Sequence, residues 1–185
     1  MLELGSGTGL VGLTAAAILF RSHRVARVVL SDFDTDALSN LQHNVKLNSI
    51  VIGDDVTVER LDWGTTSDRD GRYDVILGAD LCFEPQHALL LHRAVSTLLA
   101  FPTSRDPDPV FELVLPLRRT HQAELDACDR AFGSCSQATS FSDLEGRRWT
   151  LQTRERTEES AGDGFGDKGD GVSRYWVYRI EWAQV

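Results

Sequence analysis

A glycine-rich turn, Gly-Ser-Gly-Thr-Gly at residues 5–9, is the feature that most constrains the fold of this chain. It stands between a short apolar segment, residues 2–4, and an apolar run, residues 10–21, with helical spacing. Glycine lets the backbone turn sharply and approach a ligand without a Cβ in the way. The amides that open the following helix favour a carboxylate or a phosphate. The pattern therefore predicts a strand, a ligand-binding turn and a helix, with a tight turn that binds nothing as the alternative.

Strand-like and helix-like segments alternate along most of the chain. Further strands are predicted over 26–31, 56–61, 73–79 and 110–115, and helices after the cap at 34–35, over 85–100 and over 120–132. Segments 149–156 and 175–182 alternate apolar and polar residues, which predicts an antiparallel hairpin at a sheet edge. The fold class is therefore α/β with an open, mostly parallel sheet, and ligands of such sheets bind at the carboxyl ends of the strands.

The helical periodicity also predicts which side chains face the core. For the helix over 10–21 these are Leu10, Leu13, Ala17 and Ile18, and for the helix over 85–100 they are Leu89, Leu90, Ala94 and Leu98.

Length and composition narrow the class of protein. The 185 residues predict one domain over 1–185, and 42% hydrophobic with 25% charged residues excludes a disordered or fibrous chain. The longest apolar run, residues 10–20, is too short to cross a bilayer, and no signal peptide is visible. We expect a soluble protein of the cytoplasm, with the nucleus as a second compartment. Residues 158–173 are rich in glycine and aspartate, which predicts a flexible loop rather than a calcium site.

Charge and cysteine content bear on partners and metals. The chain has 28 acidic and 19 basic residues and a net charge of −9, which disfavours a nucleic-acid partner and favours a basic protein surface. Cys82, Cys128 and Cys135 have no C-x-x-C spacing, so neither a disulfide framework nor a zinc site is expected. No metal site and no membrane contact are predicted.

Acidic residues follow the predicted strands. Asp32 is placed to accept hydrogen bonds from both hydroxyls of a ribose, and Asp34 either shares this role or caps the next helix. Two cofactors fit this arrangement. Gly7-x-Gly9-x-x-Gly12 matches the dinucleotide fingerprint, with Asp32 lying 20 residues further on. The longer pattern E-L-G-x-G-x-G resembles the first motif of S-adenosylmethionine-dependent methyltransferases.

Two later strand ends carry further candidates. Asp62 can accept from an exocyclic adenine amine and Trp63 can flank the ring, although a tryptophan here is also an ordinary core residue. Asp80, after a predicted buried strand, is expected at the centre of the carboxyl edge, where the reacting group would lie.

Taken together, these motifs resemble methyltransferase family 16, the eukaryotic seven-β-strand protein-lysine methyltransferases. The resemblance runs from residue 1 to about 133, and the hairpin extends it to 185. It rests on the E-L-G-S-G-T-G-L motif from Glu3, on Ser31-Asp32, on Leu61-Asp62-Trp63 and on the G-A-D-L-C-F motif at 78–83. It implies a Rossmann-like class I fold whose seven-stranded sheet has six parallel strands and one antiparallel strand.

The resemblance also implies the site. S-adenosyl-L-methionine would be bound by Glu3, Gly5, Ser6, Gly7, Thr8, Gly9, Asp32, Phe33, Asp62, Trp63 and Ala79. The family's D-x-x-Y motif, which holds the target lysine, corresponds to Asp80-Leu-Cys-Phe83, so Asp80 and Phe83 are the predicted catalytic residues. Phenylalanine replaces the family's tyrosine, which keeps an aromatic face for a lysine but removes the hydroxyl.

The implied activity is methyl transfer from S-adenosylmethionine to a lysine of a protein substrate. The alternatives are a small-molecule N-methyltransferase, an NAD-dependent oxidoreductase and a non-catalytic S-adenosylmethionine-binding module. Because only two residues precede Glu3, which leaves the first strand short, we also expect that an N-terminal segment of the family is missing.

Overall fold

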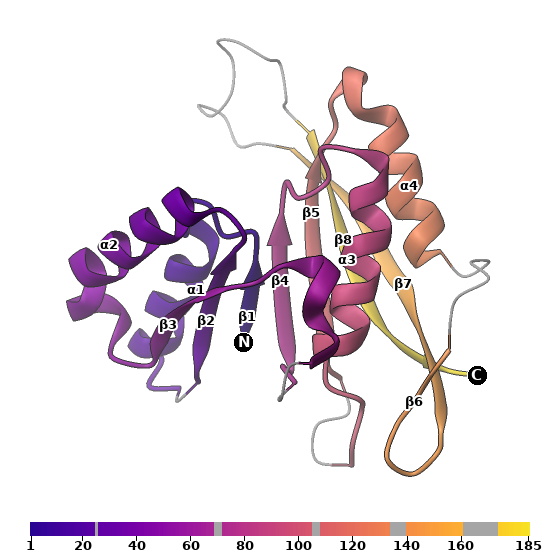
Figure 1. Ribbon diagram of the computed structural model, residues 1–185, viewed down its shortest axis with the longest axis horizontal. Helices are drawn as coiled ribbons and strands as arrows, with labels where there is room; N and C mark the ends of the chain where they lie inside the picture. Colours follow the sequence, from indigo (N-terminus) through magenta and orange to yellow (C-terminus); the bar gives the residue numbers. More distant parts are fainter. Residues whose placement is uncertain (25, 69–71, 105–107, 134–139, 161–173) are drawn as a thin grey trace.

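The structure, a computed structural model, describes residues 1–24, 26–68, 72–104, 108–133, 140–160 and 174–185. In these residues the predicted alternation of strands and helices is present, and the strands form one mixed sheet (Figure 1). Its order is β3-β2-β1-β4-β5-β8-β7-β6. The strands are β1 (Leu2–Leu4), β2 (Val28–Asp32), β3 (Val56–Arg60), β4 (Val75–Ala79), β5 (Val110–Pro116), β6 (Phe141–Ser142), β7 (Arg148–Ser160) and β8 (Arg174–Gln184).

Strand direction agrees with the class I prediction. Strands β1 to β5 pair in parallel, whereas β8 is antiparallel to both β5 and β7, so β7 runs in the direction of β1 to β5. Six strands therefore share one direction and β8 opposes them. The structure adds β6, a two-residue strand antiparallel to β7, which is too short to show a sequence period.

Four α-helices and two short 3₁₀ helices connect the described strands. They are α1 (Leu10–Arg21), α2 (Thr35–Ile52), η1 (Trp63–Asp68), α3 (Pro85–Leu98), η2 (Arg119–His121) and α4 (Gln122–Phe132). Asp34 caps α2, because its carboxylate accepts from the backbone N–H groups of Asp36 and Ala37, each at 2.9 Å. Pro85 opens α3, where its missing N–H costs no hydrogen bond.

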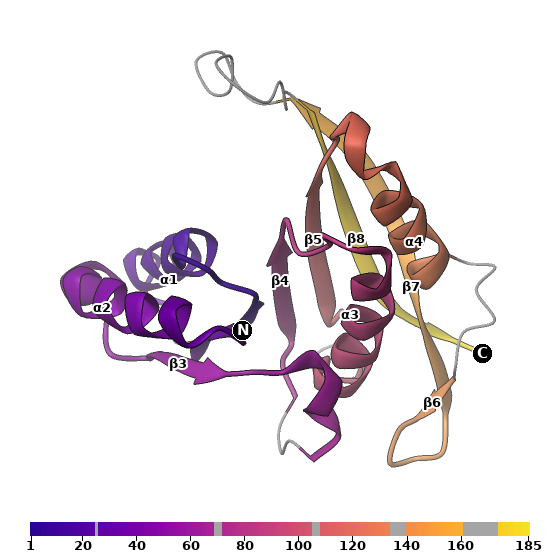
Figure 2. The same cartoon turned by 45° about the horizontal axis from the view of Figure 1, so that its top comes forward.

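The helices cover the sheet in two groups. Helices α1 and α2 lie against β1 to β3, and α3 and α4 lie against the half that contains β4, β5, β8 and β7 (Figures 1 and 2). Side chains of β2 alternate between the two faces: Val29 joins the apolar cluster of α3 and α4, while Val28 and Leu30 join that of α1 and α2. Strand β2 is thus buried on both faces, whereas Val75, Leu77 and Ala79 on one face of β4 are only half-buried.

The predicted inward faces of two helices were partly wrong. In α1, Leu10 and Ile18 are 74% and 60% exposed, and the buried positions are Gly12 and Ala16. In α3, Leu89 is 70% exposed. The buried positions there are Ala88, Leu91, Ala94, Val95, Ser96 and Leu98. In α1 the small residues Gly12 and Ala16 are the buried ones, whereas the buried stripe of α3 combines small residues with Leu91 and Leu98.

The C-terminal hairpin is confirmed as β7 and β8, which pair along their length with one bulge between Thr153 and Glu155. Residues 158–160 of the predicted loop belong to β7, and 161–173 lie outside the described residues. Cys135 also lies outside them. No helix in the described part of the chain is long and apolar enough to cross a membrane.

Candidate functional site

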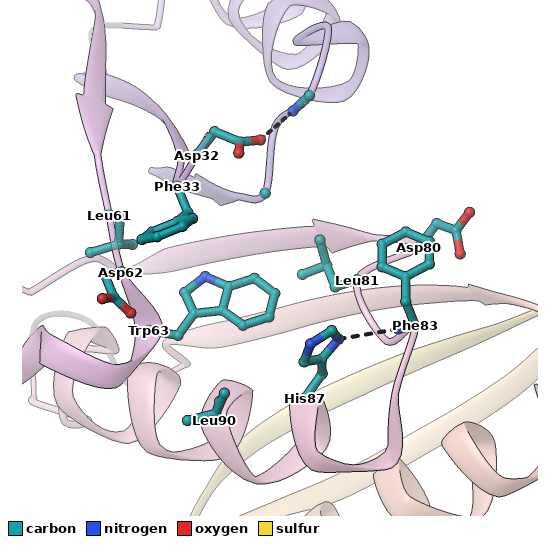
Figure 3. Close-up of a pocket in the computed structure, with 12 residues that line it drawn as sticks. Asp32, Phe33, Leu61, Asp62, Trp63, Asp80, Leu81, Phe83, His87 and Leu90 are labelled. Carbon is teal, nitrogen blue, oxygen red and sulfur yellow. Dashed lines mark hydrogen bonds between the residues drawn. The ribbon is translucent and has the colours of Figure 1, made fainter. Parts of the chain in front are cut away.

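A pocket of about 520 Å³ opens where the carboxyl ends of β1, β2, β3 and β4 meet. This volume falls within the range of small-molecule sites, roughly 300–1,000 Å³. Its lining comes from the glycine turn, from three strand ends and from α3 (Figure 3). The lining residues are Gly5, Gly7, Asp32, Phe33, Leu61, Asp62, Trp63, Asp80, Leu81, Phe83, His87 and Leu90.

The glycine turn needs its glycines for both conformation and space. Gly5, Gly7 and Gly9 have φ angles of 57°, 53° and 83°, in the left-handed region that disfavours other residues. A Cβ on Gly5 would lie 2.6 Å from the Leu81 side chain and 3.6 Å from that of Trp63. The turn thus keeps bare backbone at the wall of the pocket.

Asp32 ties the end of β2 to this turn. Its Oδ2 accepts from the Gly7 N–H at 2.9 Å, drawn as a dashed line in Figure 3, and its Oδ1 accepts from the Asp34 N–H at 3.0 Å. The carboxylate is therefore fixed at the pocket wall. Beside it, Phe33 is 57% exposed, with the Arg60 guanidinium 4.6 Å from its ring centre.

Asp62 and Trp63 form the wall beyond β3. The Asp62 Oδ1 accepts from the Gly64 N–H at 2.8 Å, which fixes the carboxylate at the start of η1. The Trp63 ring meets the His87 ring edge-to-face, with centroids 6.3 Å apart. This arrangement gives the pocket one broad aromatic wall with a carboxylate beside it.

Asp80 lies just beyond β4 in a backbone conformation that is rare for a residue with a side chain, at φ 53°. Its N–H donates to the Val114 carbonyl of β5 at 2.9 Å. Its two carboxylate oxygens accept from the two terminal nitrogens of Arg118, at 2.9 and 2.7 Å. In Figure 3 the carboxylate points away from Trp63, at the far end of the site.

Phe83 lines the same end of the pocket and is 56% exposed. Its N–H donates to Nδ1 of His87, in the first turn of α3, at 3.3 Å. This contact requires an unprotonated Nδ1, so the ring is held as an acceptor toward the loop.

The structure does not bring every predicted cofactor residue to the pocket. Glu3, Ser6, Thr8, Gly9 and Ala79 are outside its lining. Glu3 is 3% exposed, and its Oε2 has no hydrogen-bond partner among the described residues. The roles of these five residues in cofactor binding stay predictions.

Two sets of residues were not predicted. Leu61, Leu81, His87 and Leu90 line the pocket. The spacing of His87 and Leu90 from Phe83, four and seven residues, is a helical signal that could have identified them. Arg118, the partner of Asp80, follows the carboxyl end of β5, so the strand-end position that indicated Asp32, Asp62 and Asp80 could also have identified it. Among the described residues, no cluster of three or more His, Cys, Asp or Glu side chains could hold a metal ion.

Comparison with solved structures supports the fold. TrmN from Thermus thermophilus superposes over 98% of this chain and 43% of its own, with a TM-score of 0.65 and 15% sequence identity.

Curated relatives are more similar in sequence. Protein-lysine N-methyltransferase EFM2 of Saccharomyces cerevisiae is 34% identical over 131 residues, which are 67% of this chain and 29% of the relative. Protein-lysine N-methyltransferase rrg1 of Schizosaccharomyces pombe is 32% identical over 139 residues, 70% of this chain and 42% of the relative. The chain thus spans less than half the length of these relatives. The family model described as lysine methyltransferase matches residues 1–124, and the chain belongs to that family.

Proposed function

We propose that the pocket binds S-adenosylmethionine and that the protein transfers its methyl group to a lysine of a protein substrate. One observation carries the proposal: Asp32, Asp62 and Asp80, from three different strand ends, line one pocket together with Gly5 and Gly7. Membership of the lysine methyltransferase family, and relatives named protein-lysine N-methyltransferases, support the same reaction and acceptor.

The residues present fit this cofactor. The bare backbone at Gly5 and Gly7 leaves room that a Cβ on Gly5 would close, as a ligand pressed against the turn requires. Asp32 and Asp62 present carboxylates, which suit ribose hydroxyls and an adenine amine, and Trp63 presents an aromatic edge and face. When bound, S-adenosylmethionine supplies a methyl group on a positively charged sulfur, so the protein's task is largely one of positioning.

The acceptor amine must lose its proton before it can react. A free lysine has a pKa of about 10.4, so only ~1 molecule in 10³ is neutral at pH 7. Leu81 and Phe83 present apolar side chains near Asp80, and loss of water around an amine that enters beside them would lower the pKa of that amine. The Phe83 ring can also attract the side chain while it is still an ammonium. Asp80 orients the amine by accepting a hydrogen bond from it.

The test is transfer of label from radioactive S-adenosylmethionine into a protein extract, followed by amino-acid analysis of the labelled band. The proposal expects methyl-lysine. Asp80→Asn should lower the transfer rate about 100-fold, because it disturbs the position of the amine. Its affinity for S-adenosylmethionine, measured by calorimetry, should change by no more than about threefold. The matched control is Asp126→Asn on the exposed side of α4, which should leave both quantities unchanged.

Other outcomes identify the alternatives. Label in a small molecule but in no protein would indicate a small-molecule N-methyltransferase. Binding of S-adenosylmethionine without any transfer would indicate a non-catalytic module. Binding of NAD in place of S-adenosylmethionine would indicate an oxidoreductase that uses the G-x-G-x-x-G pattern of residues 7–12.

A further inference from the structure

Arg118, which is not among the residues that line the pocket, binds the carboxylate of Asp80. Arg118 donates to both of its oxygens, at 2.9 and 2.7 Å, in a two-pronged pair. The two side chains are 30% exposed for Arg118 and 40% exposed for Asp80, so water screens this pair less than it screens a fully exposed one. Such fork-to-fork pairs fix geometry as well as charge.

Strand β5 positions both the backbone of Asp80 and the side chain of Arg118. The Asp80 N–H donates to the Val114 carbonyl in β5, which holds its backbone at φ 53°. Arg118 follows two residues after the end of β5 at Pro116. The same strand therefore holds the backbone and, through its extension, the carboxylate. A non-glycine residue kept in a rare conformation by its surroundings is typical of a functional position.

An unpaired carboxylate at this position would oppose the chemistry. A negative charge within about 4–6 Å of an amine favours the ammonium and raises the amine's pKa by about 1–3 units. An ammonium has no lone pair and cannot accept a methyl group. A site that orients a lysine with a carboxylate must therefore prevent that carboxylate from holding the proton on the lysine.

We propose that Arg118 is a charge-balancing positioning residue for Asp80. Arg118 cancels the negative charge of Asp80 and leaves it as a hydrogen-bond acceptor, so that the bound acceptor amine loses its proton more readily. The inference rests on the proposed function, because it needs an amine acceptor at Asp80. It adds to the site a residue that does not line the pocket.

Other ionisable groups face the same pocket. His87 comes from α3, Asp32 from β2 and Asp62 from the segment after β3. Asp32 and Asp62 lie toward the glycine turn and the Trp63 wall, whereas His87 contacts the Asp80–Phe83 loop through the Phe83 N–H. His87 is therefore the ionisable lining residue that contacts this loop, and the test includes a variant of it.

The test measures kcat against pH, from about pH 6.5 to about pH 9.5, because kcat reports ionisation in the bound complex. The probe is the acceptor protein purified from the labelled band of the extract experiment, used at saturating concentration. The variants are Arg118→Gln, which removes the charge, and Arg118→Lys, which keeps it. Arg27→Gln removes the same charge from the exposed Arg27–Glu59 pair and is the matched control. His87→Asn keeps an acceptor for the Phe83 N–H but does not titrate.

For Arg118→Gln we expect the rising limb of the kcat profile to move up by about one pH unit. At pH 7.5 this shift lowers kcat about tenfold, whereas near pH 9.5 kcat returns to within about threefold of the wild-type value. The KM for the acceptor should fall, because an unbalanced Asp80 attracts an ammonium. Arg118→Lys should restore the wild-type profile, and the shift should persist in the His87→Asn background. Thermal unfolding and calorimetric binding of S-adenosylhomocysteine should be the same for wild type, Arg118→Gln, Arg118→Lys and Arg27→Gln.

Three results would overturn the inference while leaving the proposed function intact. An equal loss of kcat at every pH would make Arg118 a purely structural support. A rise of kcat at pH 7.5 in Arg118→Gln would make Arg118 a competitor that the lysine must displace. A profile unchanged from wild type would mean that Arg118 has no influence on the amine. Failure of the wild-type protein to methylate lysine would instead overturn the proposed function, and the inference with it.

Discussion

Glu3 lies beneath the glycine turn with its carboxyl group almost entirely removed from water. Burial raises its pKa above the ordinary value of 4.5, hydrogen bonds from Ser6 and from the Gly12 N–H lower it, and the nearby charge of Asp32 raises it further. Because burial is the largest of these effects, the folded protein resists ionisation of this residue. Glu3 is thus a buried acid with one carboxyl oxygen, Oε2, that has no hydrogen-bond partner among the described residues.

This burial predicts a pH dependence of stability. Between the unfolded pKa and the higher folded pKa, the native protein binds more protons at Glu3 than the unfolded chain does. As pH rises through that window, ionisation of Glu3 lowers the free energy of unfolding of the wild-type protein. Below the unfolded pKa, Glu3 is protonated in both states and has no such effect. The free energy of unfolding of Glu3→Gln, relative to wild type, should increase from about pH 4 to about pH 8. Urea unfolding of both proteins at the two pH values measures these free energies. A difference between Glu3→Gln and wild type that does not change with pH would contradict the prediction.

Helix α1 depends on close contact with the sheet. A Cβ added to Gly12 would collide with the side chain of Leu30 in β2 and lie 2.5 Å from the Glu3 Oε2. Both contacts are with buried groups, so neither can move away freely. The absence of a side chain at Gly12 therefore sets the distance between α1 and the start of the site.

Gly12→Ala should destabilise the protein by about 1–3 kcal/mol, because overpacking outweighs the better helix propensity of alanine. The comparison is with Val11→Ala, one position away on the exposed side, where a change within about 0.5 kcal/mol is expected. Urea unfolding of both variants measures the difference. Equal stability of the two variants would show that α1 shifts without cost.

Elements with a strong local signal could be predicted from the sequence, and those that depend on tertiary contacts could not. The strand ends at Asp32, Asp62 and Asp80 share one pocket, as expected, because parallel strands place their carboxyl ends at one edge. The buried stripe of α1 was missed because small residues, not large ones, face the sheet. Arg118 follows the carboxyl end of β5 in the same way, but its pairing with Asp80 depends on β4 and β5 being neighbours in the sheet, which the local pattern does not show.

At the scale of the whole molecule, two apolar clusters lie on opposite faces of the sheet. The larger one joins α3 and α4 to the hairpin and includes Cys82, next to the site, and Cys128 in α4. Their Sγ atoms are 3.1 Å apart, and the two residues are 6% and 0% exposed. The hydrogen bond with Cys82, followed by burial, raises the pKa of Cys128, so this thiol stays protonated. The packing of α4 therefore protects both thiols.

We expect neither thiol to react quickly with a thiol reagent in the native protein, because reaction requires the thiolate and access. The measurement uses a Cys135→Ser background, in which only Cys82 and Cys128 remain. Reaction with Ellman's reagent should be slow without denaturant and should account for two thiols in urea. Rapid labelling of either thiol under native conditions would show that α4 separates easily from the rest of the protein.

The central claim is that the pocket at the carboxyl edge is a site for S-adenosylmethionine, and calorimetric titration tests it most directly. S-adenosylmethionine should bind with a stoichiometry of about one, and Asp32→Ala should weaken binding at least about tenfold, since it removes a charged hydrogen-bond acceptor. Asp36→Ala, on the first turn of α2, is the control and should bind as wild type does. NAD at about 1 mM should give no binding heat. Saturable binding of NAD with none of S-adenosylmethionine would contradict the account.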